Sequence, residues 1–169
     1  MADETPTPPE KQLQLQKIYI KDLSFESPKT PDVFATNAAP QTQLNIRSGA
    51  REVAPDTQEV TLTLTVEAKG DNNTLFLIEL VQAGIFLIQG YNDEEQQMLT
   101  GSYCPGSLYP FAREAIADIV TRGGFPQLLL QPINFDALYA QALRERASGN
   151  GGEQAAPAPE GQQQPEETH

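Results

Sequence analysis

The sequence holds one histidine, one cysteine and no tryptophan. The histidine is His169, the last residue of a Gln- and Pro-rich stretch, and the cysteine is Cys104. A serine or cysteine triad needs a histidine base held within the fold, and a zinc site needs several Cys or His ligands. The sequence therefore argues against histidine-dependent hydrolysis and against a metal centre within one chain. A single cysteine also excludes an intrachain disulfide and fits a reducing compartment.

Other catalytic signals are equally scarce. Gly123-Gly124 lacks the Lys and Ser spacing of a phosphate-binding loop and follows a predicted helix, so nucleotide binding is disfavoured. The adjacent acids Glu94 and Glu95 are typical of a solvated loop face. Cys104 lies near a predicted helix start, and a helix N-terminus favours the reactive thiolate, so a reactive thiol is one interpretation. A buried residue with a packing role is the stronger interpretation. We expect no enzyme activity, no cofactor and no metal.

The charge is strongly acidic, and part of it lies at the two ends of the chain. The net charge is −12, from 11 basic and 23 acidic residues. Every Lys and Arg lies within Lys11–Ala147, where 16 acids leave a net charge of −5. Seven acids lie outside this segment: Asp3, Glu4, Glu10, Glu153, Glu160, Glu166 and Glu167. Phosphate binding needs clustered Lys and Arg, so we expect no nucleic acid and favour a basic partner.

Long hydrophobic runs are also missing. No stretch is apolar enough to span a bilayer, and the polar N-terminus lacks the basic flank and apolar run of a signal peptide. We therefore expect a cytoplasmic protein without membrane insertion. The length suits one domain, which we place at residues 11–147. Residues 1–10 and 148–169 are rich in Pro, Gln, Gly and acids, a composition that predicts disordered tails.

A period of two residues in Leu13 to Phe25 predicts the first strand. Its odd positions are mostly apolar. The other face begins with Ile18 and Ile20 and becomes acidic at Asp22 and Glu26. A strand with this pattern lies half buried and presents carboxylates to water at one end.

Three further strands are predicted, at Gln41–Arg47, Glu59–Ala68 and Thr74–Ile88, with a hairpin at Gly70–Asn73. The last strand is apolar on both faces, and one face of a small antiparallel sheet normally meets water. The second apolar face therefore needs another cover, which predicts oligomerisation. We assign the subunit contact to three residues of this strand: Phe76, Ile78 and Leu80.

The last third of the chain predicts helices. A short helical turn is expected at Asp93–Leu99, and Ser107 is expected to cap a helix with Pro110 in its first turn. That helix stops at Gly123-Gly124, and Asn134 caps a second one. Four strands followed by two helices make an α+β domain.

Two noncatalytic features remain. Irregular segments carry surplus apolar residues, which either anchor the core or line a groove for an extended apolar chain: Val33, Phe34, Phe125, Leu128, Leu129, Leu130 and Ile133. Asp22 and Glu26, joined by Glu79 of the apolar strand, form a candidate acidic surface. The alternative is an ordinary solvated face, with Glu79 paired to Lys17 or Lys21.

The block Ile18-Tyr-Ile-Lys-Asp-Leu-Ser-Phe-Glu-Ser-Pro28, followed by Pro31-Asp-Val-Phe34, resembles the opening of the SecB family of protein-export chaperones. Further blocks in the family's order extend the resemblance over the predicted domain: Gln82-Ala-Gly-Ile-Phe86, Tyr103-Cys-Pro105, Tyr109-Pro-Phe-Ala-Arg-Glu114, Arg122-Gly-Gly-Phe-Pro-Gln127 and Pro132-Ile-Asn-Phe-Asp-Ala-Leu138. The chain departs from the family at Lys69–Thr74 and beyond Ala147.

The resemblance implies a four-stranded antiparallel sheet with two helices, assembled as a dimer of dimers. It implies a chaperone that binds unfolded precursors of exported proteins and passes them to the SecA ATPase, whose own C-terminal segment carries zinc. The family's substrate groove corresponds to Val33, Phe34, Phe125, Leu128, Leu130, Tyr139 and Leu143. Its SecA-binding residues correspond to Asp22, Glu26, Leu77 and Glu79. A binding protein for a small apolar ligand is the alternative, in which the groove closes into a pocket.

Overall fold

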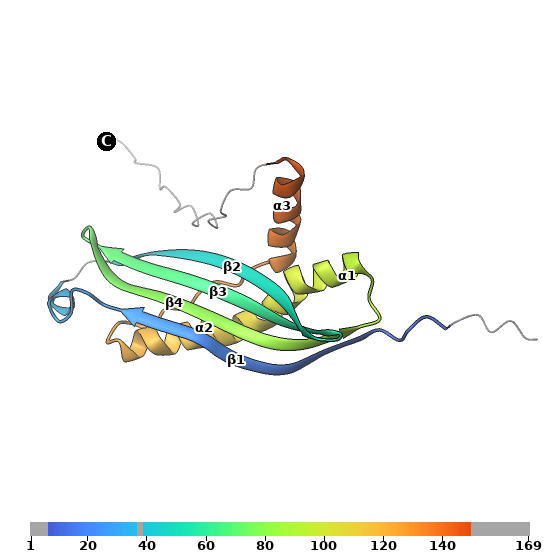
Figure 1. Ribbon diagram of the computed structural model, residues 1–169. Helices are drawn as coiled ribbons and strands as arrows, with labels where there is room; N and C mark the ends of the chain where they lie inside the picture. The colour runs from blue at the N-terminus through green and yellow to red at the C-terminus, as the bar shows by residue number, and fades with distance from the viewer. Residues whose placement is uncertain (1–6, 37–38, 150–169) are drawn as a thin grey trace, which may run out of the picture.

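The computed structural model describes residues 7–36 and 39–149 of the chain. Four antiparallel strands form one sheet in the order β1-β4-β3-β2, and a long helix, α2, packs across one face (Figure 1). The strands are β1 (Gln12–Glu26), β2 (Gln41–Ala54), β3 (Thr57–Gly70) and β4 (Asn73–Gln89). The helical elements are η1 (Asp32–Ala35), α1 (Asp93–Met98), η2 (Leu99–Tyr103), α2 (Cys104–Arg122) and α3 (Phe135–Ala147).

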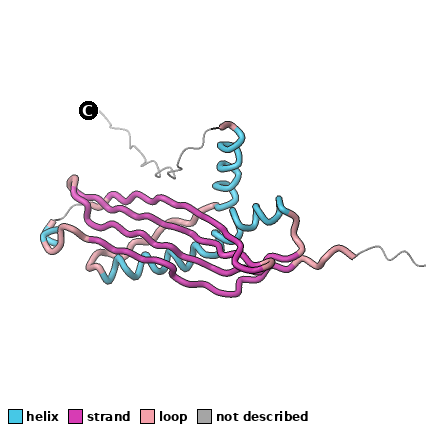
Figure 2. The backbone as a smooth tube through the Cα atoms, in the orientation of Figure 1, coloured by secondary structure: helices cyan, strands magenta, loops and turns pink. Residues whose placement is uncertain are grey.

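The sheet has two chemically different faces. We call the face under α2 the covered face and the other the open face, which carries no helix among the described residues (Figures 1 and 2). On β3, apolar side chains from Val60 to Ala68 point to the covered face and are fully buried. The alternating Thr and Glu residues point to the open face, as the two-residue period predicts.

The first strand follows the predicted alternation only in part, because two β-bulges interrupt it. Register shifts occur between Leu15 and Lys17 and between Ile20 and Asp22. Each extra residue moves the following side chains to the other face. Ile20 therefore lies opposite the buried Gln82 on the covered face, whereas Asp22 lies on the open face. The prediction that Ile20 and Asp22 share one face was wrong, because the bulge at Lys21 separates them.

Strand β4 is apolar on both faces, as predicted, but the three residues assigned to the subunit contact are buried inside a single chain. Phe76, Ile78 and Leu80 point to the covered face and are at most 4% exposed within a single chain. A side chain already buried in this way has no surface left for a partner subunit. The open face of β4 carries the partly exposed residues Leu77, Val81, Ile85 and Leu87.

The turns follow from their residues. Asp71 and Asn72 both have positive φ angles, and they join β3 to β4 in a two-residue hairpin, as predicted. A second hairpin, which the sequence did not reveal, has Asp56 at positive φ and joins β3 to a β2 strand longer than predicted. The outer half of β2, after Arg47, is exposed on both faces, so its sequence shows little hydrophobic alternation.

The helical segment is continuous from Asp93, so the predicted helix start at Ser107 was wrong. One turn of π-helix, η2, links α1 to α2, and Pro105 rather than Pro110 occupies the first turn of α2. The Ser107 hydroxyl donates a hydrogen bond to the Tyr103 carbonyl instead of capping the helix. The predicted end was right: α2 stops at Gly123, and Gly124 has a φ of +87°.

Helix α3 begins where predicted, because the Asn134 side chain accepts a hydrogen bond from the Ala137 amide. Residues 7–11 form neither helix nor strand, while residues 1–6 and 150–169 of the predicted tails lie outside the described residues. Among the helices that the structure describes, none combines the length and apolar character needed to cross a bilayer.

Candidate functional site

Four phenylalanines lie close together at one end of the molecule. They come from the crossover between β1 and β2, which contains η1, from the sheet, and from the connector between α2 and α3 (residues 123–134). The Phe34 ring of η1 lies 5.3 Å from the ring of Phe125 in the connector after α2. Phe125 in turn lies 5.0 Å from Phe76 of β4, and Phe76 lies 6.1 Å from Phe25 of β1. Phe34 is 52% exposed, whereas Phe76 is buried. The cluster therefore runs from solvent into the core.

The two glycines after α2 make room for these rings. A Cβ atom on Gly123 would lie 2.3 Å from the Phe25 ring, and one on Gly124 would lie 3.0 Å from the Phe34 ring. Gly124 also has the positive φ that favours glycine. The Gly-Gly turn thus sets how closely Phe25 and Phe34 approach the connector.

The predicted groove residues divide into buried anchors and exposed side chains. Val33 and Leu130 are buried and belong to the core. Phe125 and Leu128 are partly buried and pack against that core. Phe34, Leu129 and Leu143 are 52%, 65% and 43% exposed, so they remain available to another chain.

Tyr139 and Leu143 lie on α3, apart from the phenylalanine cluster. The Tyr139 ring packs on Gly101 of η2, where an added Cβ would lie 2.6 Å from the ring. The connector that joins the two regions is tied to α2 by the Tyr109 hydroxyl, which donates to the Gln131 carbonyl at 2.5 Å. The groove residues therefore lie along an extended path beside α2.

An open depression of about 510 Å³ lies where the connector meets the start of α2. Tyr103, Pro110, Ile133 and Phe135 are among its lining residues, and none of the seven predicted groove residues lines it. No sequence pattern predicted a pocket here, although the Pro132–Leu138 block contributes several of its walls. The depression adds apolar surface between Phe125 and α3.

The predicted acidic surface is formed by neighbouring strands on the open face. Glu26 of β1 lies opposite Leu77 of β4, and Ser24 lies opposite Glu79. Asp22, Glu26 and Glu79 are exposed, and Leu77 is partly exposed beside Glu26. The structure thus brings all four predicted residues together. Glu79 lies beside Ser24 and Thr65, and it is not the partner of Lys21.

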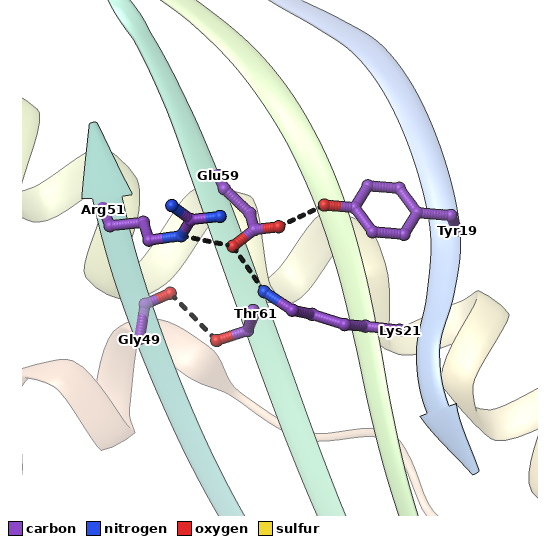
Figure 3. A network of polar contacts seen from close by, with 6 residues as sticks. All are labelled: Tyr19, Lys21, Gly49, Arg51, Glu59 and Thr61. Atoms are coloured by element: carbon purple, nitrogen blue, oxygen red, sulfur yellow. Dashed lines mark hydrogen bonds and ion pairs between the residues drawn. The ribbon is translucent and has the colours of Figure 1, made fainter. Parts of the chain in front are cut away.

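Lys21 instead binds Glu59, a buried carboxylate that the sequence analysis did not single out. Figure 3 shows Tyr19, Lys21 and Arg51 converging on Glu59 across the open face. Lys21 Nζ and Arg51 Nε each lie 2.8 Å from Glu59 Oε1, and the Tyr19 hydroxyl donates to Oε2. Three hydrogen bonds together lower the pKa of Glu59 to about 2. The bond from Lys21 has the largest effect, and those from Tyr19 and Arg51 have smaller ones.

Comparison with known proteins assigns the family. A family model described as preprotein translocase subunit SecB matches residues 6–146. The chain belongs to the SecB family. It is 50% identical over 144 residues to the protein-export protein SecB of Nitrosococcus oceani, covering 84% of this chain and 88% of that protein. It is 47% identical to the protein of the same name from Thioalkalivibrio sulfidiphilus, covering 89% and 90%.

A solved structure shares the SecB fold. The Mycobacterium tuberculosis Rv1957 SecB-like chaperone, in complex with a ChAD peptide from the Rv1956 HigA1 antitoxin, matches with a TM-score of 0.60. The match covers 72% of this chain and 90% of that one at 15% identity. The fold is therefore shared although few residues are.

Two residues that were considered for chemistry, Cys104 and Glu95, have structural surroundings in this SecB protein. Cys104 is fully buried, and burial raises the pKa of its thiol to about 12, which opposes nucleophilic use. Glu95 completes a capping box with Asn92 and pairs with Lys11 at 2.6 Å. Within the described part of the chain, no three His, Cys, Asp or Glu side chains are placed to hold a metal ion.

Proposed function

We propose that this SecB protein is a chaperone that binds unfolded precursors of exported proteins and delivers them to the SecA ATPase. The observation that carries the proposal is apolar surface left exposed in irregular segments, above all at Phe34 and Leu129, in a chain of the SecB family. Burial of apolar area is non-directional and tolerates many sequences. Native proteins have already buried the segments that such a surface accepts, so unfolded chains are selected.

The groove is proposed to run from Phe34 and Phe125, past Leu128 and Leu130, to Tyr139 and Leu143. Buried Val33 and Leu130 support its floor, while the exposed residues contact the client. The small-ligand alternative requires a closed apolar pocket. Exposed side chains along an open path favour an extended client instead.

The acidic surface of Asp22, Glu26, Leu77 and Glu79 is proposed to bind a basic segment of SecA. The surface lies on the open face, whereas the groove lies on the covered side, so client and SecA can bind together. Opposite charges speed the encounter and make it sensitive to salt. Any zinc belongs to SecA, and no cofactor or catalytic step is proposed for this chain.

The chaperone is proposed to act in the cytoplasm as a homotetramer, a dimer of dimers, without binding nucleic acid or inserting into the membrane. Support for assembly comes from apolar side chains that one chain leaves exposed: Leu15, Ile20, Leu23, Met98 and Phe111. Patches of this kind commonly mark subunit contacts. They take the place of Phe76, Ile78 and Leu80 in our account of the interface.

Light scattering tests the chaperone function. A chemically unfolded precursor is diluted into buffer with and without the full-length protein. We expect aggregation to be suppressed near one tetramer per client. No suppression at several-fold excess would contradict the proposal, and selective binding of a small apolar ligand would favour the alternative.

A further inference from the structure

The open face is divided by charge along its length. The strand register places Lys17, Ile85, Glu59 and Arg51 in one row across the sheet, near the β2–β3 hairpin. Lys21 and Arg47 lie within two rows of it. We call Lys17, Lys21, Arg47 and Arg51 the basic cluster. The acidic surface around Glu26 and Glu79 lies at the opposite end of the same face.

The basic cluster is incompletely neutralised. Lys21 and Arg51 share the single carboxylate of Glu59. Lys17 and Arg47 are exposed, and no ion pair or side-chain hydrogen bond involves either of them among the described residues. Asp22, beside Lys21 on β1, is the nearest further acid on the same face. Four cations thus face two carboxylates, in a chain whose net charge is −12.

The segment that follows α3 has the opposite charge. Residues 150–169 contain no Lys or Arg and four glutamates: Glu153, Glu160, Glu166 and Glu167. Helix α3 leads into this segment from the half of the molecule that holds the β2–β3 hairpin (Figure 1). The turn η2 contacts both α3 and β2, so α3 is connected through this turn to the strand that carries Arg47 and Arg51.

Distance does not prevent contact between the two. Twenty residues span at most about 72 Å when extended, whereas the 13 residues of α3 are about 20 Å long and four strands span about 15 Å from the first to the last. We propose that residues 150–169 dock on the basic cluster through their glutamates. The docking does not depend on SecA or on client binding.

Weak intrinsic affinity is enough for this docking. A segment tethered on the same chain meets its site at an effective concentration in the millimolar range, so a dissociation constant of about 1 mM gives half occupancy. Exposed charge pairs are screened over about 8 Å at physiological ionic strength, so occupancy falls as salt rises. With the segment docked, the open face presents negative charge at both ends.

Carbodiimide cross-linking of the full chain, read by mass spectrometry, tests the proposal. The reagent joins a lysine amine to a glutamate carboxyl as an amide, and the carbodiimide takes up the water that is lost. We expect glutamates of residues 150–169 to link to Lys17 and Lys21 at least threefold more than to Lys29 and Lys69, which are exposed outside the cluster. In 0.5 M salt the preference should disappear.

The variant Arg47→Gln with Arg51→Gln removes two cations and leaves both reporter lysines in place. We expect the links to Lys17 and Lys21 to fall at least threefold, while those to Lys29 stay unchanged. Arg144→Gln with Arg146→Gln, on α3 and closer along the chain, is the matched control and should change nothing. Arg47→Gln alone, which leaves the Glu59 network intact, should give a smaller fall. Equal linking of all lysines, or links unaffected by removal of Arg47, would overturn the proposal.

Discussion

The two faces of the sheet use the same strands for different chemistry. On the covered face, residues such as Leu64 and Ile78 are fully buried under α2, and apolar contact surrounds them. On the open face, charged side chains of all four strands form the acidic surface and the Glu59 network (Figure 3), and no helix among the described residues covers them (Figure 1). The covered face carries the apolar core and the groove, whereas the open face carries the charged groups.

The contrast is sharpest between adjacent residues of β4. Phe76 and Leu77 are both large and apolar, yet Phe76 is buried against Phe25 and Phe125 and Leu77 lies beside Glu26. Their position in the two-residue period, rather than their hydrophobicity, decides their surroundings. Substitutions at these two positions therefore separate the faces.

The largest effect is expected for Phe76→Ala. Removing a buried ring leaves a cavity and costs about 3–5 kcal/mol in the free energy of unfolding. Leu77→Ala removes a partly exposed side chain and should cost about 1 kcal/mol or less. Urea unfolding at one fixed protein concentration measures both, because assembly makes stability depend on concentration. Equal costs would contradict the assignment of the two residues to different faces.

A smaller loss of stability is expected for Glu59→Gln, a substitution on the open face. The carboxylate accepts three hydrogen bonds, two of them from cations, and their loss should cost about 1–3 kcal/mol at pH 7. Glu52→Gln on the exposed end of β2 is the matched control and should lie within about 0.5 kcal/mol of the wild type.

The contribution of Glu59 to the free energy of unfolding should also depend on pH. Its pKa is lowered in the folded chain from the ordinary 4.5 to about 2, so its contribution is fully present above pH 4.5. That contribution is lost as the pH falls from 4.5 through about 2. The difference in unfolding free energy between wild type and Glu59→Gln should shrink over this range. A difference that stayed constant would contradict the role of the ionised carboxylate.

Client binding should respond to Phe34→Ala with little change in stability. The ring is 52% exposed, and burying the remainder against a client contributes about 1 kcal/mol, or about fivefold in affinity. Val53→Ala, an exposed apolar residue in the outer part of β2, is the control and should leave affinity unchanged. Fluorescence anisotropy with a labelled unfolded precursor makes the measurement. An unaltered affinity for Phe34→Ala would remove the crossover from the groove.

Much of the fold was predictable because its signals are local. The alternation in β3, the Asp71-Asn72 hairpin and the Asn134 cap each follow from a few neighbouring residues. The bulges of β1 were not predictable, because an extra residue such as Lys21 changes the face without a change in composition. The early start of α2 was missed because Cys104 and Pro105 resemble a turn, and only packing makes them helical.

The candidate site divides in the same way. Asp22, Glu26 and Glu79 were predicted as an acidic surface from the strand pattern, and the family resemblance added Leu77 and the SecA role. Pairing of β1 with β4 brings the four residues together. The buried role of Glu59 was not predicted, because Glu59 is one acid in a strand of alternating Thr and Glu residues. The sequence of that strand does not indicate that Tyr19 and Arg51 bind it. That convergence depends on strand order, which local sequence does not encode.

An effect similar in size to that of Phe34→Ala, but on SecA binding, is expected for Asp22→Ala with Glu26→Ala. Exposed charge pairs contribute about 0.2–1 kcal/mol each, so the loss of two should lower SecA affinity about twofold to thirtyfold. Calorimetry in low salt measures the change, and the client affinity of the variant should match that of the wild type. SecA affinity equal to that of the wild type would remove these two acids from the SecA site.

Native mass spectrometry with SecA and an unfolded precursor both present tests the separation of the two faces most directly. The wild type should form a ternary complex of tetramer, client and SecA. Asp22→Ala with Glu26→Ala should reduce the SecA-bound species and keep the client, whereas Phe34→Ala should reduce the client and keep SecA. Loss of both ligands in either variant, or displacement of the client by SecA without transfer, would contradict the account.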